Sequence, residues 1–264
     1  MTSTTAARAV GVDWRRAARP LLVVGFWVAV WQVAALVVDQ PILLVGPGGV
    51  LVRLGELVVT ADFWGTVAHS LGRIVAGFAL AAVVGVLAAA LAATSRVVDA
   101  LLTPLLTAVR TTPVVSFIIL VLLWADSGQL AVVIAFLMVL PVLYTNVLEG
   151  IRHRDRTLLE VAQVFDVPLL RRLPAIDVPA VLPYFSAGCR IGVGLAWKSG
   201  IAAEVIGLPQ GSIGERLYEA KIFLSSADLF AWTVVIIALS VAVEKLVLAL
   251  LGRLERRLAR GRAA

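Results

Sequence analysis

The chain has 264 residues, of which 61% are hydrophobic and only 15% are charged, and its formal net charge is +6. This hydrophobic share exceeds the roughly 45–50% of soluble domains, so a soluble chain of this length could not bury its apolar side chains. Apolar runs of about twenty residues recur, which is the length of a membrane-spanning helix, whereas a membrane β-barrel would need short alternating segments. The composition therefore indicates an all-α, polytopic membrane protein.

The basic residues lie between the apolar runs, where they set membrane topology and do not form a nucleic-acid-binding patch. The single cysteine, Cys189, lies inside an apolar run. We interpret it as a small core residue, because it has no second cysteine with which to form an intramolecular disulfide.

The first part of the chain combines one apolar run with a loop. Residues 1–20 are polar and arginine-rich, and the apolar run 21–38 follows without a small-residue cleavage site. We predict a cytoplasmic N-terminal segment at 1–20 and an uncleaved first span. The Pro- and Gly-containing stretch that follows, within 21–65, predicts an external loop with an interfacial helix around 50–59.

Five further apolar runs predict the remaining spans, at 69–93, 98–124, 130–148, 183–206 and 229–251, with a basic tail at 252–264. Small residues recur every four positions on the second span, a pattern that lets another helix approach closely in lipid. This stripe consists of Gly77, Ala81, Gly85, Ala89 and Ala93.

Two prolines, Pro104 and Pro113, fall inside the third predicted span, where each frees a backbone carbonyl that neighbours must satisfy. The presumed external segments hold only Arg53, Arg216 and Lys221, whereas arginine clusters occupy the presumed cytoplasmic segments. About six spans with both termini in the cytoplasm satisfy the positive-inside rule. We therefore expect a multi-pass protein of the cell membrane.

One polar, arginine-bearing segment interrupts the apolar second half of the chain, at 152–179. Its apolar residues recur at three- and four-residue spacing, which predicts helix with an apolar face. Pro168 should end one short helix or begin the next, because it cannot donate a hydrogen bond inside a helix. We predict two short helices in water between two spans, with an apolar face available to a partner.

The order Glu160-x-Ala162, a helix break at Asp166, and Ile176-x-x-Pro179 resembles the EAA loop of ABC-importer permeases. The resemblance implies that this loop seats in a groove of a separate cytoplasmic ATPase, with Glu160 in a salt bridge or cap and Ala162 in close packing there. The family more often has Gly where this chain has Asp166. Asp tolerates left-handed backbone better than most residues, which makes the turn compatible with this departure.

Further motifs are similar to the nitrate/sulfonate/taurine branch of these permeases, and together they cover about 66–251. The resemblance implies a type I importer permease with the MetI-like fold, a domain at 66–251, and partners that include an ATPase subunit and an extracytoplasmic binding protein. A single loop per chain further implies a homodimer in the lipid membrane. The motifs are S-L-x-R-x-x-x-G-F-x-L-A from Ser70, P-x-x-x-x-L-R-x-x-P from Pro104 with Trp124, Pro141…Asn146…Gly150, and GLPQGSIG after Ala203-Glu204.

The sequence contains no P-loop, no nucleophile elbow and no Cys/His metal spacing, so we expect neither an enzyme nor a bound cofactor. ATP would then be hydrolysed by another chain. An ion-coupled secondary transporter is the alternative, but such proteins usually carry acidic residues near the middle of the membrane. Here Glu149, Glu204 and Glu244 lie near the ends of predicted spans.

Three basic residues, Arg110, Arg190 and Lys198, lie within or near the third and fifth predicted spans. Under one interpretation, the arginines snorkel to the membrane surface and Lys198 pairs with Glu204 or a carbonyl. Under the other, Lys198 lines the pathway and favours a small anionic or zwitterionic solute, as the resemblance to sulfonate, nitrate and taurine permeases also implies. The sequence leaves both interpretations open.

Overall fold

The computed structural model describes the backbone of residues 14–261 and the side chains of residues 22–256. Most of the predicted N-terminal segment 1–20, and the end of the tail 252–264, lie outside the described residues. The described chain is helical and contains no strand. Its helices are α1 Trp14–Val38, α2 Pro47–Val58, α3 Ala61–Thr94, α4 Arg96–Thr111, α5 Val114–Leu122, α6 Ser127–Arg152, α7 Arg156–Val164, α8 Leu169–Arg172, a π-helix Leu173–Asp177, α9 Val178–Gly207, α10 Ile213–Ile222 and α11 Ser226–Gly261.

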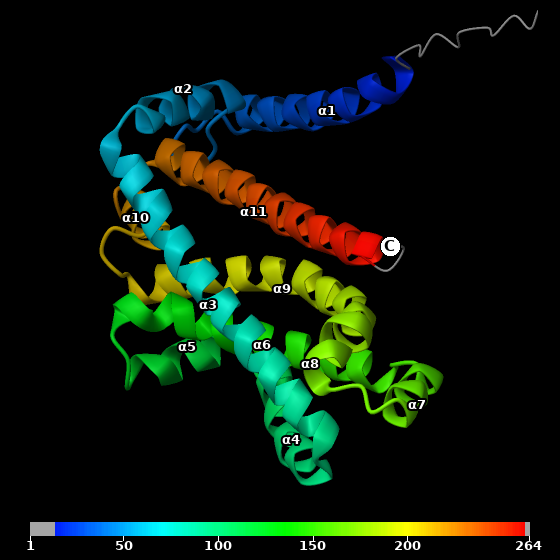
Figure 1. Cartoon of the computed structure of the whole chain (residues 1–264). Coiled ribbons are helices and arrows are strands. Elements are labelled where there is room, and N and C mark those ends of the chain that lie inside the picture. Colours follow the sequence, from blue (N-terminus) through cyan, green and yellow to red (C-terminus); the bar gives the residue numbers. More distant parts are fainter. Residues whose placement is uncertain (1–13, 262–264) are drawn as a thin grey trace, which may run out of the picture.

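The core forms where α6 packs along both α3 and α9 (Figure 1). Small residues permit this approach: a Cβ at Gly77 would lie 2.5 Å from the carbonyl oxygen of Val132 on α6. The predicted stripe is buried from Gly77 to Ala89, but Ala93 is exposed and Ala92 is buried in its place. The stripe shifts because a helix repeats every 3.6 residues, so a strict four-residue spacing drifts around its surface.

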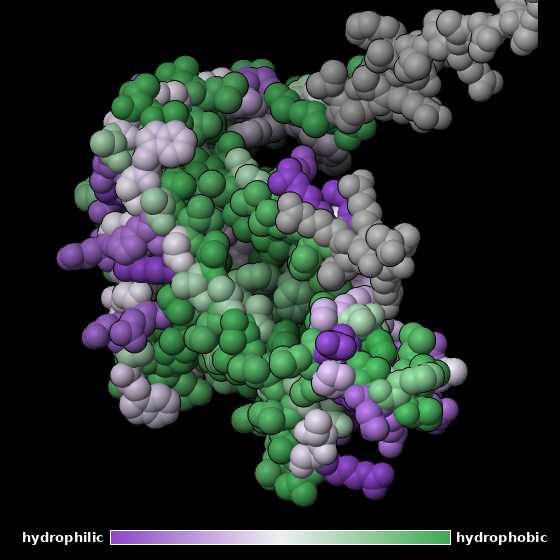
Figure 2. All heavy atoms as spheres, in the orientation of Figure 1, coloured by the Kyte–Doolittle hydropathy of each residue, from purple (hydrophilic) through white to green (hydrophobic). Residues whose placement is uncertain are grey.

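Four helices of the described chain are long and apolar enough to cross a membrane, and a fifth span results if the bent pair α4–α5 is counted as one. The apolar part of α1, Leu22–Val38, is shorter. With it, the prediction of about six spans is compatible with the structure. Figure 2 shows hydrophobic residues over most of this face, with hydrophilic residues gathered beside α10 and around α7 and α8.

The third predicted span, at 98–124, is not one straight helix. The chain stays helical through Pro104, then breaks at Thr112 and Pro113, where α4 and α5 meet at a bend of 103°. Thr112 adopts an extended conformation (φ −77°, ψ 135°), which is the conformation that a following proline imposes. Of the two prolines in the predicted span, only Pro113 lies at the break, whereas Pro104 lies inside α4.

Contacts at the end that carries α10 connect the N-terminal helices to the bundle. The predicted interfacial helix around 50–59 corresponds to α2, whose Arg53 Nε donates to Asp228 of α11 over 2.6 Å. Hydrogen bonds to Asp228 and Glu56 raise the pKa of the Arg53 guanidinium. Trp31 of α1 donates its indole N–H to the carbonyl of Val45. The start of α11 is thereby held beside α2.

Candidate functional site

The polar segment folds into two short helices separated by a left-handed residue, as the sequence predicts. Asp155 caps α7, because its side chain accepts a hydrogen bond from the Thr157 amide over 2.8 Å. After α7, Asp166 adopts φ 46°, and the Val167 amide donates to the carbonyl of Ala162 over 2.8 Å. Gly favours this conformation and Asp tolerates it better than most residues, so Asp166 is compatible with the turn. Pro168, in an extended conformation, precedes α8.

The short helix α7 and the turn after it present two different faces. Ala162, which is 4% exposed, packs inward against the chain itself. Large apolar side chains face outward, and Val164, Phe165 and Leu170 are 79%, 75% and 85% exposed. Glu160 is also exposed, and it forms no ion pair within residues 22–256. The outward face includes Phe165 and Leu170 of the apolar face that the periodicity predicts. Val164 lies outside that periodic set, and Ala162, which belongs to it, is buried instead.

The second half of the segment runs into α9 without a loop. The π-helix Leu173–Asp177 joins α8 to α9, so Ile176 and Pro179 lie at this junction, where both are half-buried. A π-helical turn of this kind is rare and is frequently found at functional sites. Because they lie at this junction, the motif residues Ile176 and Pro179 mark the point where the polar segment continues into the long helix α9.

The base of the segment is closed by an ion cluster around Asp177, which the sequence motif does not include. Arg154 Nη1 pairs with Asp177 Oδ1, and Arg172 Nε donates to Asp177 Oδ2 over 3.0 Å. Arg154 Nε also donates to the carbonyl of Ile151 at the end of α6, over 2.8 Å. The signal available in the sequence was an acid that ends a stretch rich in arginine, but spacing alone did not indicate which arginines it binds.

The three predicted pathway residues, Arg110, Arg190 and Lys198, are all exposed. None of them forms an ion pair with another described residue, and no hydrogen bond joins one to another. Arg190 and Lys198 are eight residues apart on α9, just over two turns, which places them on neighbouring parts of the helix surface, and Ile191 is also exposed. Arg110 lies separately, in the last turn of α4.

The alternative pairing of Lys198 with Glu204 is not seen. Glu204 is fully buried, and its Oε2 accepts hydrogen bonds from Ser70 Oγ over 2.7 Å and from the Gly214 amide over 3.3 Å. Ser70 Oγ in turn accepts from the Ile213 amide over 2.9 Å. Glu204 therefore joins α3, α9 and the start of α10. A Cβ at Gly214 would lie 2.4 Å from Glu204 Cβ, so glycine is required for this approach.

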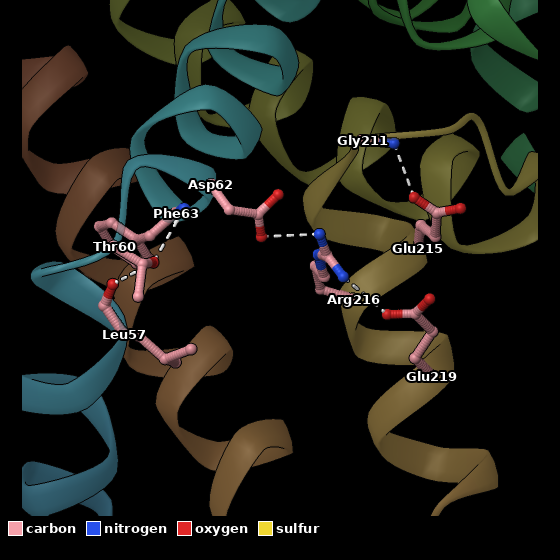
Figure 3. A network of polar contacts seen from close by, with 8 residues as sticks. All are labelled: Leu57, Thr60, Asp62, Phe63, Gly211, Glu215, Arg216 and Glu219. Atoms are coloured by element: carbon pink, nitrogen blue, oxygen red, sulfur yellow. Dashed lines mark hydrogen bonds and ion pairs between the residues drawn. The ribbon is translucent and has the colours of Figure 1, made fainter.

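The start of α10 is ordered by a local capping arrangement, shown in part in Figure 3. Ser212 Oγ accepts from the Glu215 amide over 3.0 Å, and Glu215 Oε2 accepts from the Gly211 amide over 2.6 Å. Arg216 reaches across to Asp62 at the start of α3 over 2.7 Å. The GLPQGSIG stretch thus forms a rigid cap at the end of the bundle opposite α7 (Figure 1).

Comparison with known proteins identifies this architecture. Residues 81–260 match the sequence model of a family described as "Binding-protein-dependent transport system inner membrane component". The chain belongs to this family. It is thus a permease subunit of an ABC importer, an all-helical multi-pass membrane protein rather than an enzyme, and its ATPase is a separate subunit.

Relatives of the permease come from several bacteria. A putative aliphatic sulfonates transport permease protein of Bacillus subtilis is 30% identical over 218 residues, which cover 81% of this chain and 78% of the relative. A bicarbonate transport system permease protein of Synechococcus elongatus is 31% identical over 159 residues, covering 60% of this chain and 57% of the relative. A probable ABC transporter permease protein of Haemophilus influenzae is 27% identical over 226 residues, covering 85% and 91% of the two chains.

These similarities place the permease in the nitrate/sulfonate branch that the sequence motifs indicate, and they give no support to an ion-coupled secondary transporter. A binding-protein-dependent component works with an ATPase and with a substrate-binding protein. Within the part of the chain that the structure describes, no group of at least three His, Cys, Asp or Glu side chains could hold a metal ion.

Proposed function

We propose that the permease binds its ATPase through residues 152–179, and that the outward apolar face of α7 and α8 is the contact surface. The observation that carries this proposal is the exposure of the apolar side chains of Val164, Phe165 and Leu170. A loop in water without a partner would be expected to bury such side chains. A contiguous exposed apolar patch with a polar rim marks a site of interaction with another protein. Glu160 supplies a charged contact at the rim of this patch.

The other motif residues shape this surface from within. Asp166 turns the chain between α7 and α8, and Ala162 packs α7 onto the rest of the segment rather than entering the ATPase groove. Ile176 and Pro179 set the junction with α9. In this proposal the family motif encodes the shape of the segment, and the neighbouring Val164, Phe165 and Leu170 provide most of the contact area.

Phe165→Asp tests the contact surface. A charge at a central apolar contact should abolish capture of the ATPase in mild detergent, because the carboxylate would have to be buried without a partner. The matched control is Phe223→Asp, since Phe223 is 77% exposed, close to the 75% of Phe165, but lies at the end with α10. The measurement is the ATPase recovered with the purified permease. Normal recovery with Phe165→Asp would rule out the proposed surface.

We further propose that the transported solute is a small anion or zwitterion. The relatives named above carry the names of an aliphatic sulfonate and a bicarbonate permease, and both solutes are small anions. An unpaired Arg or Lys in lipid costs about 2.5–3.5 kcal/mol at mid-helix, so Arg110, Arg190 and Lys198 should face water rather than lipid. A water-filled path bounded by α9 would meet this requirement and would attract an anion.

The whole importer, in this proposal, contains two copies of the permease. The exposed cations of α9 would then face a central path between the copies, and each copy would seat one ATPase. The capped end with α10 would face the extracytoplasmic binding protein, while α7 and both chain termini would lie in the cytoplasm. The arginine-rich segment around α7 and α8 supports this orientation. Capture of a cytoplasmic ATPase by α7 in the experiment above would establish it.

A further inference from the structure

Arg154 and Arg172 lie at the two ends of one lobe of the chain, and both bind the carboxylate of Asp177. The lobe comprises residues 155–171, which include α7 and the turn at Asp166, and Arg154 and Arg172 flank it directly. Both arginines bind Asp177, one carboxylate oxygen each. The ion cluster therefore connects the two ends of the lobe at its base. We call these three residues, Arg154, Arg172 and Asp177, the clasp.

The acid at the centre of the clasp is shielded from water. The Asp177 side chain is 9% exposed, compared with 24% for Arg154 and 35% for Arg172. Removing the acid would leave two cations together in a partly buried place, which is strongly unfavourable. The hydrogen bond from Arg154 Nε to Ile151 also anchors the cluster to the end of α6. The carboxylate is thus held between three elements, α6, α8 and α9.

Two hollows flank the clasp. A cavity of about 510 Å³ lies between the base of the lobe, α3 and α9, and a second of about 380 Å³ lies between the clasp and α7. Arg154 and Arg172 line both cavities, while Asp177 lines the first. The ion pairs therefore lie between two hollows, where they connect both flanks of the lobe to Asp177, the residue that precedes α9.

Asp177 also lies directly before the long helix α9. Asp177 is the last residue of the π-helix, and α9 continues from it without interruption to Gly207. Lys198 lies about 30 Å farther along this helix, at the ordinary rise of about 1.5 Å per residue. Any displacement of Asp177 along or around the helix axis is therefore passed to the exposed face that carries Arg190 and Lys198.

We propose that Asp177 is the positioning residue that makes the ATPase-binding lobe move together with α9. This inference rests on the proposed function of residues 152–179. When the ATPase displaces α7, the clasp prevents the lobe from swinging freely at Asp166 and at the π-helix, and α9 follows. Asp177 touches neither the ATPase nor the solute in this role. It acts through the two arginines.

The test uses the full chain in complex with its ATPase, in nanodiscs, with Cys189→Ser as background. Spin labels at Gln163→Cys on α7 and Ile191→Cys on α9, diluted with unlabelled chain, report the distance between lobe and helix. We expect one narrow distance that does not change between the nucleotide-free and the ATP-bound complex. In Asp177→Asn, an isosteric change, the distance should broaden and should shift when nucleotide binds.

A second readout separates positioning from simple support of the fold. The labelling rate of Ile191→Cys with a hydrophilic maleimide should change with ATP in the parent chain, and this change should be lost in Asp177→Asn and in Arg172→Gln. Arg171→Gln is the matched control, because Arg171 is the exposed neighbour and forms no ion pair among the described residues. A labelling response to ATP that survives in Asp177→Asn would overturn the proposal.

The two proposals fail in distinguishable ways. If the parent chain does not bind the ATPase, the proposed function of residues 152–179 is wrong. The distance between α7 and α9 in the permease alone still tests the clasp in that case. A distance distribution as narrow in Asp177→Asn as in the parent would then exclude a clasp of any function.

Discussion

At the scale of single residues, charge is distributed in two different ways. At the ends of the bundle, charged side chains are paired, as in Arg216 with Asp62 and Arg154 with Asp177. On the face of α9, Arg190 and Lys198 have no ion-pair partner within the described chain. Paired charges hold elements together, whereas unpaired ones remain available to a solute.

Lys198→Met tests this availability. Hydrogen bonds to charged groups contribute about 1.5–3 kcal/mol, which corresponds to a roughly ten- to hundred-fold slower uptake if Lys198 meets the anion in the rate-limiting step. The measurement is uptake of labelled methanesulfonate and of labelled bicarbonate by the reconstituted importer. Lys221→Met is the control, since Lys221 is an exposed lysine at the end of α10. If Lys198→Met takes up the transported probe as fast as the parent does, at normal protein levels, then Lys198 does not contact the solute and its role is structural.

At the scale of elements, glycines let the core helices approach each other closely. Gly77 on α3 admits the carbonyl of Val132, and Gly200 on α9 admits the side chain of Ile74, to which a Cβ would come within 2.6 Å. In lipid, where apolar side chains gain little from leaving the solvent, close packing of this kind is the main source of helix association.

Gly77→Ala should therefore weaken the contact between α3 and α6. Overpacking typically costs about 1–3 kcal/mol, and here the clash is with backbone, which cannot rotate away. Gly72→Ala is the control on the same helix, because nothing lies within 4 Å of the added Cβ. It should be neutral or slightly stabilising, by up to about 1 kcal/mol from helix propensity. Unfolding in mixed micelles measures both variants, and equal stability of the two would contradict the packing argument.

At the scale of the whole molecule, we propose that one chain is not a complete pathway. The cations of α9 lie on the outside of the monomer, and the polar segment offers one exposed apolar face, which is the proposed ATPase-binding surface. A second copy placed against the exposed face of α9 would enclose these cations and would present two such surfaces.

Native mass spectrometry of the importer should accordingly give the mass of two permease chains with two ATPase subunits. Disulfide crosslinking at Ile191→Cys, in the Cys189→Ser background, should join the two permease chains, because the exposed α9 faces would oppose each other. A complex with a single permease chain, or with a second, different permease chain, would contradict the homodimer.

The sequence alone determined the features that depend on local chemistry. Run length and composition predicted the membrane helices, and the position of Pro168 predicted a break between two short helices. The resemblance to the EAA loop put that break at Asp166, a residue that tolerates left-handed backbone better than most. The order of the motifs was enough to indicate the family. All of these follow from residues that are neighbours along the chain.

Only the tertiary structure decided which way side chains face and which distant residues meet. The period of α7 predicts an apolar face, but the way the segment folds back on itself decides that Ala162 points inward and Phe165 outward. Pro104 and Pro113 read alike in the sequence, yet only Pro113 lies at a break. The pairing of Asp177 with Arg154, 23 residues away, depends on how α6 and α9 lie against each other. Such pairings require the rotation and spacing of whole helices, which a local pattern does not contain.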